Sequence, residues 1–169
     1  MKDFLKRQRV GFYLGVAAFI LVVVGIIVQA VNVNSVGYFQ GKTIPGIGVL
    51  SALSLVFLCL GLALREFRVR FPGLIGNIMD FVGMLFLAVV PVLLSIAFMN
   101  FIHSRAEGLA FILASDDNTR ANNQSPENMA SVASAITGIV FYVIATLTSL
   151  VGVFFKTIKV EEETPVEAK

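Results

Sequence analysis

Five polar side chains near the ends of two long apolar stretches are the best candidates for a ligand site. Asn100, His103 and Glu107 are spaced i, i+3 and i+7, which places them on one face of any helix that continues past residue 103. Gln29 and Asn32 lie at the end of the first apolar stretch. The only histidine is His103, and an imidazole can change its charge between about pH 5 and 8. These residues predict a polar patch that could bind a small ligand, unless they simply mark where a hydrocarbon layer ends.

Catalytic chemistry has little support in the sequence. No nucleophile elbow, HExxH or Walker A sequence is present. The single cysteine, Cys59, excludes an internal disulfide and a CxxC pair. One histidine cannot supply both axial ligands of a bis-histidine haem, and residues 116–118 lack the spaced glycine and glutamate of a calcium loop. We therefore expect a protein that is not an enzyme and that holds no cofactor or metal.

These residues belong to a very apolar chain of 169 residues. It is 57% hydrophobic and 14% charged, with a mean hydropathy of +0.86, whereas soluble domains are about 45–50% apolar and about 25% charged. The stretch 78–102 carries one charged residue, and about 20 helical residues cross the roughly 30 Å hydrocarbon layer. We predict an all-α integral membrane four-helix bundle in a single domain, residues 1–160. Its spans are expected at about 10–31, 46–65, 78–103 and 130–156, and residues 161–169 as a disordered acidic tail.

The first apolar stretch has an alternative interpretation as a secretory signal peptide. Val28-Gln29-Ala30 would fit the small-residue cleavage site of such a peptide. However, the charge-free stretch 10–30 is longer than the usual core of about 7–15 residues. We therefore favour an uncleaved membrane span.

Basic residues are distributed unevenly between the two sides of the predicted layout. One side holds ten of them: Lys2, Lys6, Arg7, Arg9, Arg65, Arg68, Arg70, Lys156, Lys159 and Lys169. The other side holds three: Lys42, Arg105 and Arg120. The positive-inside rule then predicts that both termini are cytoplasmic. Short loops and scarce cysteine favour a bacterial cytoplasmic membrane.

The segment between the second and third spans is predicted to be a loop that carries Arg65, Arg68 and Arg70. These arginines could contact anionic lipid or a partner protein, or they could only set the topology. Asn77 is expected to cap the third helix. Asp80 would then lie at the third helical position, where an acid stabilises exposed backbone N–H groups and the positive helix end.

Two further features concern the third and fourth helices. Pro91 removes a backbone hydrogen bond near the middle of the third span, which predicts a kink that is either a hinge or a passive feature. Residues 103–130 are predicted to form the longest loop. Ser125-Pro126-Glu127 has the pattern of a helix start, which predicts that the fourth helix begins before its membrane span.

Small residues recur along the fourth span and could form a helix-packing face. They are Ala130, Ser134, Gly138, Ala145, Ser149 and Gly152, and Gly48 and Ala52 form a shorter version in the second span. In lipid, helices associate through close backbone approach rather than through hydrophobic burial. The face is therefore expected either to pack inside the bundle or to dock onto another subunit.

The sequence favours a small non-enzymatic membrane protein that acts as an accessory or interaction subunit of a larger complex. Its expected partners are membrane lipid and another membrane protein or a second copy, and the net charge of +2 does not suggest nucleic acid. The alternative is a homo-oligomeric transporter or channel for a small neutral solute. Pro91 and the hydroxyl groups of Ser54, Ser95, Tyr142, Thr146 and Ser149 would then contribute to its path.

Overall fold

The computed structural model describes residues 6–71 and 73–158. Its helices in chain order are α2 (Val10–Asn34), α3 (Ile47–Arg70), α4 (Leu74–Leu113), α5 (Arg120–Asn123) and α6 (Pro126–Val153). Within the described residues, α2, α3, α4 and α6 are each long and apolar enough to cross a membrane. The predicted all-α architecture with four such helices is confirmed. The predicted acidic tail, 161–169, lies outside the described residues.

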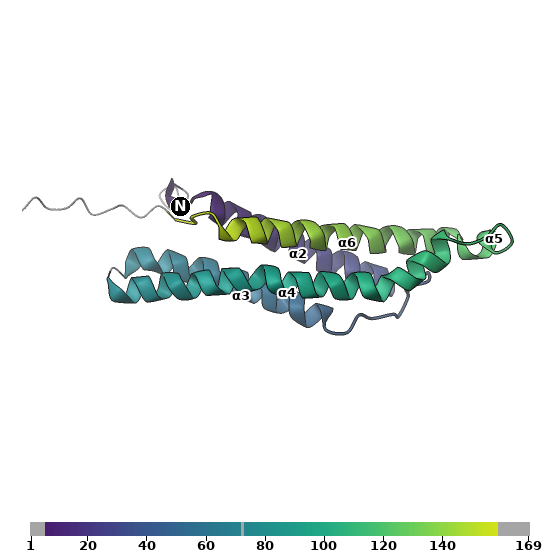
Figure 1. The fold of residues 1–169 in the computed structure, drawn as a ribbon, viewed down its shortest axis with the longest axis horizontal. Helices are drawn as coiled ribbons and strands as arrows, with labels where there is room; N and C mark the ends of the chain where they lie inside the picture. The colour runs from purple at the N-terminus through teal and green to yellow at the C-terminus, as the bar shows by residue number, and fades with distance from the viewer. Residues whose placement is uncertain (1–5, 72, 159–169) are drawn as a thin grey trace, which may run out of the picture.

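The four long helices run side by side in an elongated bundle (Figure 1). α3 packs along α4, α2 packs along α6, and α4 also contacts α6, whereas α2 and α3 touch little. Figure 1 shows the N-terminal segment, the α3–α4 connection and the end of α6 together at one end of the bundle. We call this the basic end, because Lys6, Arg7, Arg9, Arg65, Arg68, Arg70 and Lys156 lie there. The opposite end holds α5 and the loop between α2 and α3, and we call it the α5 end.

The start of α4 differs from the prediction. The helix begins at Leu74, directly after Gly73, whose φ angle is 87°. Glycine adopts a positive φ without a steric penalty, so the chain reverses direction at this point. The prediction that Asn77 caps the helix is wrong, and Asp80 lies well inside the helix rather than at its third position. The predicted loop with its three arginines is largely the last part of α3.

At the other end, α4 continues to Leu113 and extends past the predicted span. Its 40 residues correspond to a length of about 60 Å at the usual helical rise. The predicted start of the fourth helix is confirmed, because Ser125 Oγ accepts a hydrogen bond from the Asn128 N–H at 3.3 Å. Between the two helices, hydrogen bonds from the side chain and backbone of Thr119 hold the pKa of Asp116 below its usual value.

The bundle interior is filled by apolar side chains and by aromatic rings that lie against glycines. Phe101 of α4 and Tyr142 of α6 are fully buried and meet edge to face, with ring centroids 5.7 Å apart. A Cβ atom on Gly138 would lie 2.5 Å from Phe101, and one on Gly25 would lie 3.3 Å from Tyr142. Such close packing is what holds helices together in lipid, where apolar burial between helices contributes little.

Candidate functional site

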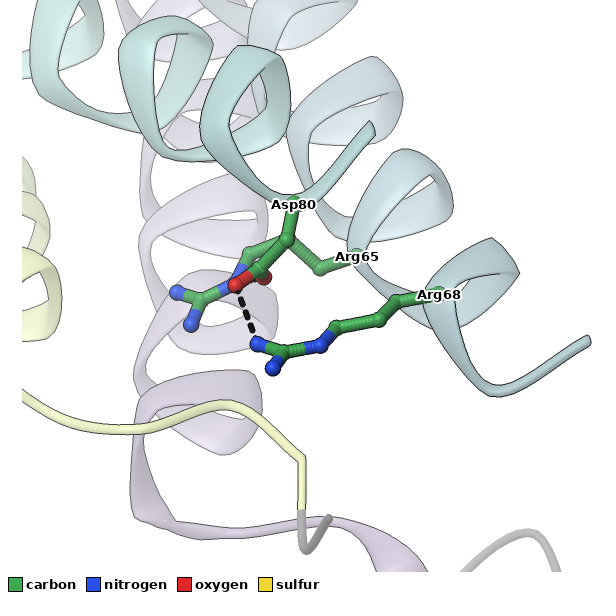
Figure 2. A network of polar contacts seen from close by, with 3 residues as sticks. All are labelled: Arg65, Arg68 and Asp80. Carbon is green, nitrogen blue, oxygen red and sulfur yellow. Dashed lines mark hydrogen bonds and ion pairs between the residues drawn. The ribbon is translucent and has the colours of Figure 1, made fainter. Parts of the chain in front are cut away.

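Arg65, Arg68 and Asp80 form a network of ion pairs at the basic end (Figure 2). Arg65 Nε donates a hydrogen bond to Asp80 Oδ1 at 3.0 Å, and Arg68 Nη1 donates to the other carboxylate oxygen. The side chains of Arg65 and Asp80 are only 12% and 14% exposed, and that of Arg68 is 35% exposed. Charge-assisted hydrogen bonds strengthen as water is removed, so this carboxylate ties the end of α3 to α4.

Two glycines position this network. At the crossing of α3 and α4, a Cβ atom on either Gly61 or Gly83 would lie 3.0 Å from the carbonyl oxygen of the other. A Cβ on Gly83 would also lie 2.7 Å from Arg65 Cγ. The Arg65 side chain therefore runs across the bare backbone of Gly83 to reach Asp80, one turn earlier in α4. The sequence analysis did not predict this arrangement. The available signal was that Gly61 lies one helical turn before Arg65 and Gly83 one turn after Asp80.

The network leaves hydrogen-bonding capacity unused. Figure 2 shows the two terminal nitrogens of Arg65 pointing away from Asp80, and they have no hydrogen-bond partner among residues 6–71 and 73–158. Two guanidinium groups face one carboxylate, so the network carries one net positive charge. It can therefore accept an anionic group without losing its own ion pairs.

An apolar cavity of about 240 Å³ adjoins the network. Arg65 of α3 lines one side of it, and Val153 of α6 lines another. The rest of its wall comes from five residues of α4: Phe81, Met84, Leu85, Leu87 and Ala88. Three of the α4 wall residues, Phe81, Met84 and Leu85, are 62%, 44% and 49% exposed. The cavity therefore opens on the outer surface of the bundle rather than in its core.

A second set of polar contacts joins the two ends of the described chain at the basic end. Arg7 and Gln8 both donate to the Glu66 carboxylate of α3, at 3.1 and 3.0 Å. The Arg9 N–H donates to the Thr157 carbonyl at 2.8 Å. Arg7 Nε, Gln8 Oε1 and Thr157 Oγ1 are buried and have no partner among the described residues. These contacts fasten the segment before α2 to α3 and to the segment after α6.

The α5 end contains a buried arginine that sequence reasoning missed. Arg105 is fully buried, donates to the Lys42 carbonyl at 2.8 Å and lies 4.6 Å from the Phe39 ring centroid. No carboxylate among the described residues pairs with it. The contacts fix the loop between α2 and α3 on α4. Its spacing could have predicted its burial, because Arg105 lies four residues after Phe101 and eight after Ala97, on the same buried side of α4.

Of the five residues of the predicted polar patch, Asn32 is built into the bundle. Its side chain is fully buried and donates to the Ser131 carbonyl and to Ser134 Oγ, both at 2.8 Å. These bonds join α2 to α6. The Oδ1 atom of Asn32 has no partner among the described residues.

The other four residues of that patch lie nearer the surface. Gln29 and Asn100 are half-buried, and His103 and Glu107 are exposed. α4 is helical through Glu107, as the spacing requires. In this part of α4, however, the buried side of the helix is the one that carries Arg105. Within the described part of the chain, no hydrogen bond or ion pair joins any two of the five patch residues.

Hydroxyl groups in the interior are satisfied within the bundle. Ser51 Oγ and Tyr142 Oη lie 2.7 Å apart and are both buried. Ser54, Ser95, Thr146 and Ser149 each donate to a carbonyl of their own helix at 2.7–2.9 Å. Of these six O–H donors, only one, on either Ser51 or Tyr142, is left without an acceptor among the described residues.

The remaining predicted residues occupy varied positions. Of the small residues of α6, Gly138, Ala145 and Ser149 are buried in the bundle, Ser134 and Gly152 are half-buried, and Ala130 is exposed.

Pro91 is buried inside a continuous α4, and the clearest bend of α4 in Figure 1 lies toward the α5 end. Arg70 lies over the Phe67 ring at 5.8 Å.

No protein-family model, curated protein or solved structure matches the chain. No group of three or more His, Cys, Asp or Glu side chains that could hold a metal ion occurs among residues 6–71 and 73–158. The four long apolar helices indicate a helical membrane protein.

Proposed function

We propose that the protein is a small non-enzymatic membrane subunit that works by binding another membrane protein within the bilayer. The observation that supports this best is one exposed face of α3. Gly48, Ala52, Cys59 and Ala63 are all exposed and fall on the same side of the helix, and we call them the α3 small face. A Cβ atom on Gly48 would meet nothing within 4 Å.

A small-residue face favours helix docking for a physical reason. Lipid is as apolar as the helices, so association depends on van der Waals contact at close backbone approach, which small side chains permit. Inside this bundle the small residues Gly61 and Gly138 are already used in that way. The α3 small face is not covered by another helix of the bundle, because α3 packs on α4 and touches α2 little. A transmembrane helix of a partner would fit there.

The interior of the bundle gives less support to the transporter alternative. A path for a neutral solute needs polar groups that are free to exchange hydrogen bonds with the solute. Ser54, Thr146 and Ser149 donate their hydroxyl protons to carbonyls of their own helices, and Ser51 and Tyr142 bond to each other. Only one of these five O–H donors therefore remains for a solute. We therefore favour an accessory subunit over a homo-oligomeric transporter.

The test is co-purification from native membranes in mild detergent. The wild-type chain is expected to recover one partner at a fixed stoichiometry, measured by mass spectrometry. Ala52→Leu combined with Ala63→Leu should reduce that recovery at least roughly tenfold, because the larger side chains prevent close approach of a helix.

The matched control is Ala30→Leu combined with Ala133→Leu, the same chemical change at exposed positions of α2 and α6. This variant should recover the partner as the wild type does. A lone monomer from wild-type membranes, or equal recovery with all three proteins, would contradict the proposal. A pure homo-oligomer would favour the transporter instead.

A further inference from the structure

We propose that the cavity beside Arg65 binds an anionic phospholipid, with one acyl chain in the cavity and the phosphate against Arg65 and Arg68. The α3 small face plays no part in this site, so the proposal is independent of the docking proposal above.

The size and lining of the cavity indicate that the part of the ligand inside it is an acyl chain. Its volume of about 240 Å³ lies below the range of about 300–1,000 Å³ that is usual for drug-sized ligands. Apart from Arg65, its wall is made of apolar side chains from α4 and α6. It opens beside exposed Phe81 and Leu85, in helices suited to span a membrane. A slender acyl chain from the surrounding lipid fits this lining better than a bulky or polar ligand.

The charges at the edge of the cavity indicate the chemistry of the headgroup. Arg65 holds Asp80 through Nε alone, which leaves its two terminal nitrogens without a partner in the described chain. Arg68 is partly exposed beside it. The pair therefore presents several N–H donors and one net positive charge, and arginine donors of this kind bind phosphate oxygens strongly.

The location supports a lipid rather than a soluble phosphate. Arg65 is both a wall of the apolar cavity and a member of the charged network, so one molecule must satisfy an apolar and an anionic contact together. A phospholipid has both parts. Under the predicted orientation, the basic end faces the cytoplasmic leaflet, where anionic lipids attract basic residues.

The experiment measures lipid binding to the delipidated full-length protein in detergent by native mass spectrometry. The probes are phosphatidylglycerol and phosphatidylcholine with the same acyl chains. The wild type should bind phosphatidylglycerol roughly fivefold more tightly, the factor expected for about one basic residue facing an anionic lipid. Equal affinity for the two lipids would overturn the proposal.

Two variants separate the headgroup contact from the tail contact. Arg68→Gln leaves Asp80 paired with Arg65 and should remove most of the preference for phosphatidylglycerol. Ala88→Phe fills the exposed mouth of the cavity without changing charge and should weaken binding of phosphatidylglycerol roughly tenfold, because the added ring takes the space that the acyl chain needs and overpacking is costly. Ala133→Phe, at an exposed position of α6, is the control and should bind as the wild type does.

A competition experiment with inorganic phosphate distinguishes a lipid site from a site for a free anion. Inorganic phosphate in millimolar excess should not displace bound phosphatidylglycerol, because it cannot occupy the apolar cavity. Displacement by phosphate would overturn the lipid assignment in favour of a simple anion site. Unchanged phosphatidylglycerol binding in Ala88→Phe would overturn the assignment of the cavity to the acyl chain, and if that variant fails to fold, Ala88→Leu gives the same test.

Discussion

At the scale of single residues, the carboxylate of Asp80 holds two guanidinium groups that would otherwise have no anionic partner among the described residues. Asn32 and Arg105 are similar cases, since each is fully buried and bonded to a segment distant in sequence. A buried polar group costs free energy unless it is hydrogen-bonded. These residues therefore fix how the helices and loops fit together.

Replacing Asp80 tests this role. Asp80→Asn should lower the free energy of unfolding by about 1–2 kcal/mol, less than for a fully buried pair because Arg68 is partly exposed. The loss should be measured as a fall in Tm in detergent, and it should shrink at high salt as the ion pairs are screened.

The control for this prediction is Asp117→Asn. Asp117 pairs with Arg120 at 3.2 Å, but the two side chains are 91% and 58% exposed. An exposed pair of this kind contributes little, so its removal should leave Tm unchanged. Similar effects of the two substitutions would show that burial does not strengthen the Asp80 network.

At the scale of helices, close packing at glycines determines which side chains meet. The crossing of α3 and α4 at Gly61 and Gly83 brings Arg65 to Asp80, and Gly138 accommodates the Phe101 ring. The clearest case is Gly83, where an added methyl group would have to displace either the Arg65 side chain or the backbone of α3.

Gly83→Ala should therefore destabilise the protein by about 1–3 kcal/mol, the usual cost of overpacking. The measurement is thermal unfolding in detergent, with the accessibility of Arg65 to a guanidinium-specific reagent as a second readout. Gly48→Ala is the control, because nothing lies within 4 Å of the added Cβ and alanine favours the helix. A neutral Gly83→Ala would contradict the role given to this crossing.

Hydrophobic pattern and local capping were sufficient to predict some features of the helices. The four long helices and the Ser125 cap follow from apolar length and from residues adjacent in the chain. The start of α4 was placed too late, because the pattern around Asn77 and Asp80 resembles a helix start whether or not a glycine has already reversed the chain. The partners of Asp80, Asn32 and Arg105 depend on contacts between helices that a single sequence does not contain.

At the scale of the whole molecule, ionic groups are concentrated at the two ends of the bundle, and the middle is apolar apart from internally bonded hydroxyls. The contacts of Arg7 and Gln8 with Glu66 join the N-terminal segment to α3 at the basic end. The bundle is therefore tied together at its ends, while α3 presents its small face outward. This division suits a protein that offers a fixed surface to a neighbour in the membrane.

The most direct test of that account uses Cys59, the single cysteine, which is exposed on the α3 small face. A membrane-permeable, thiol-attached photo-crosslinker should be applied to native membranes, and the products should be separated by mass. The control combines Cys59→Ala with Leu147→Cys, which moves the thiol to an exposed position on α6. We predict one discrete adduct with a partner from Cys59 and none from position 147. The absence of an adduct from Cys59, or the same products from both positions, would contradict docking through α3.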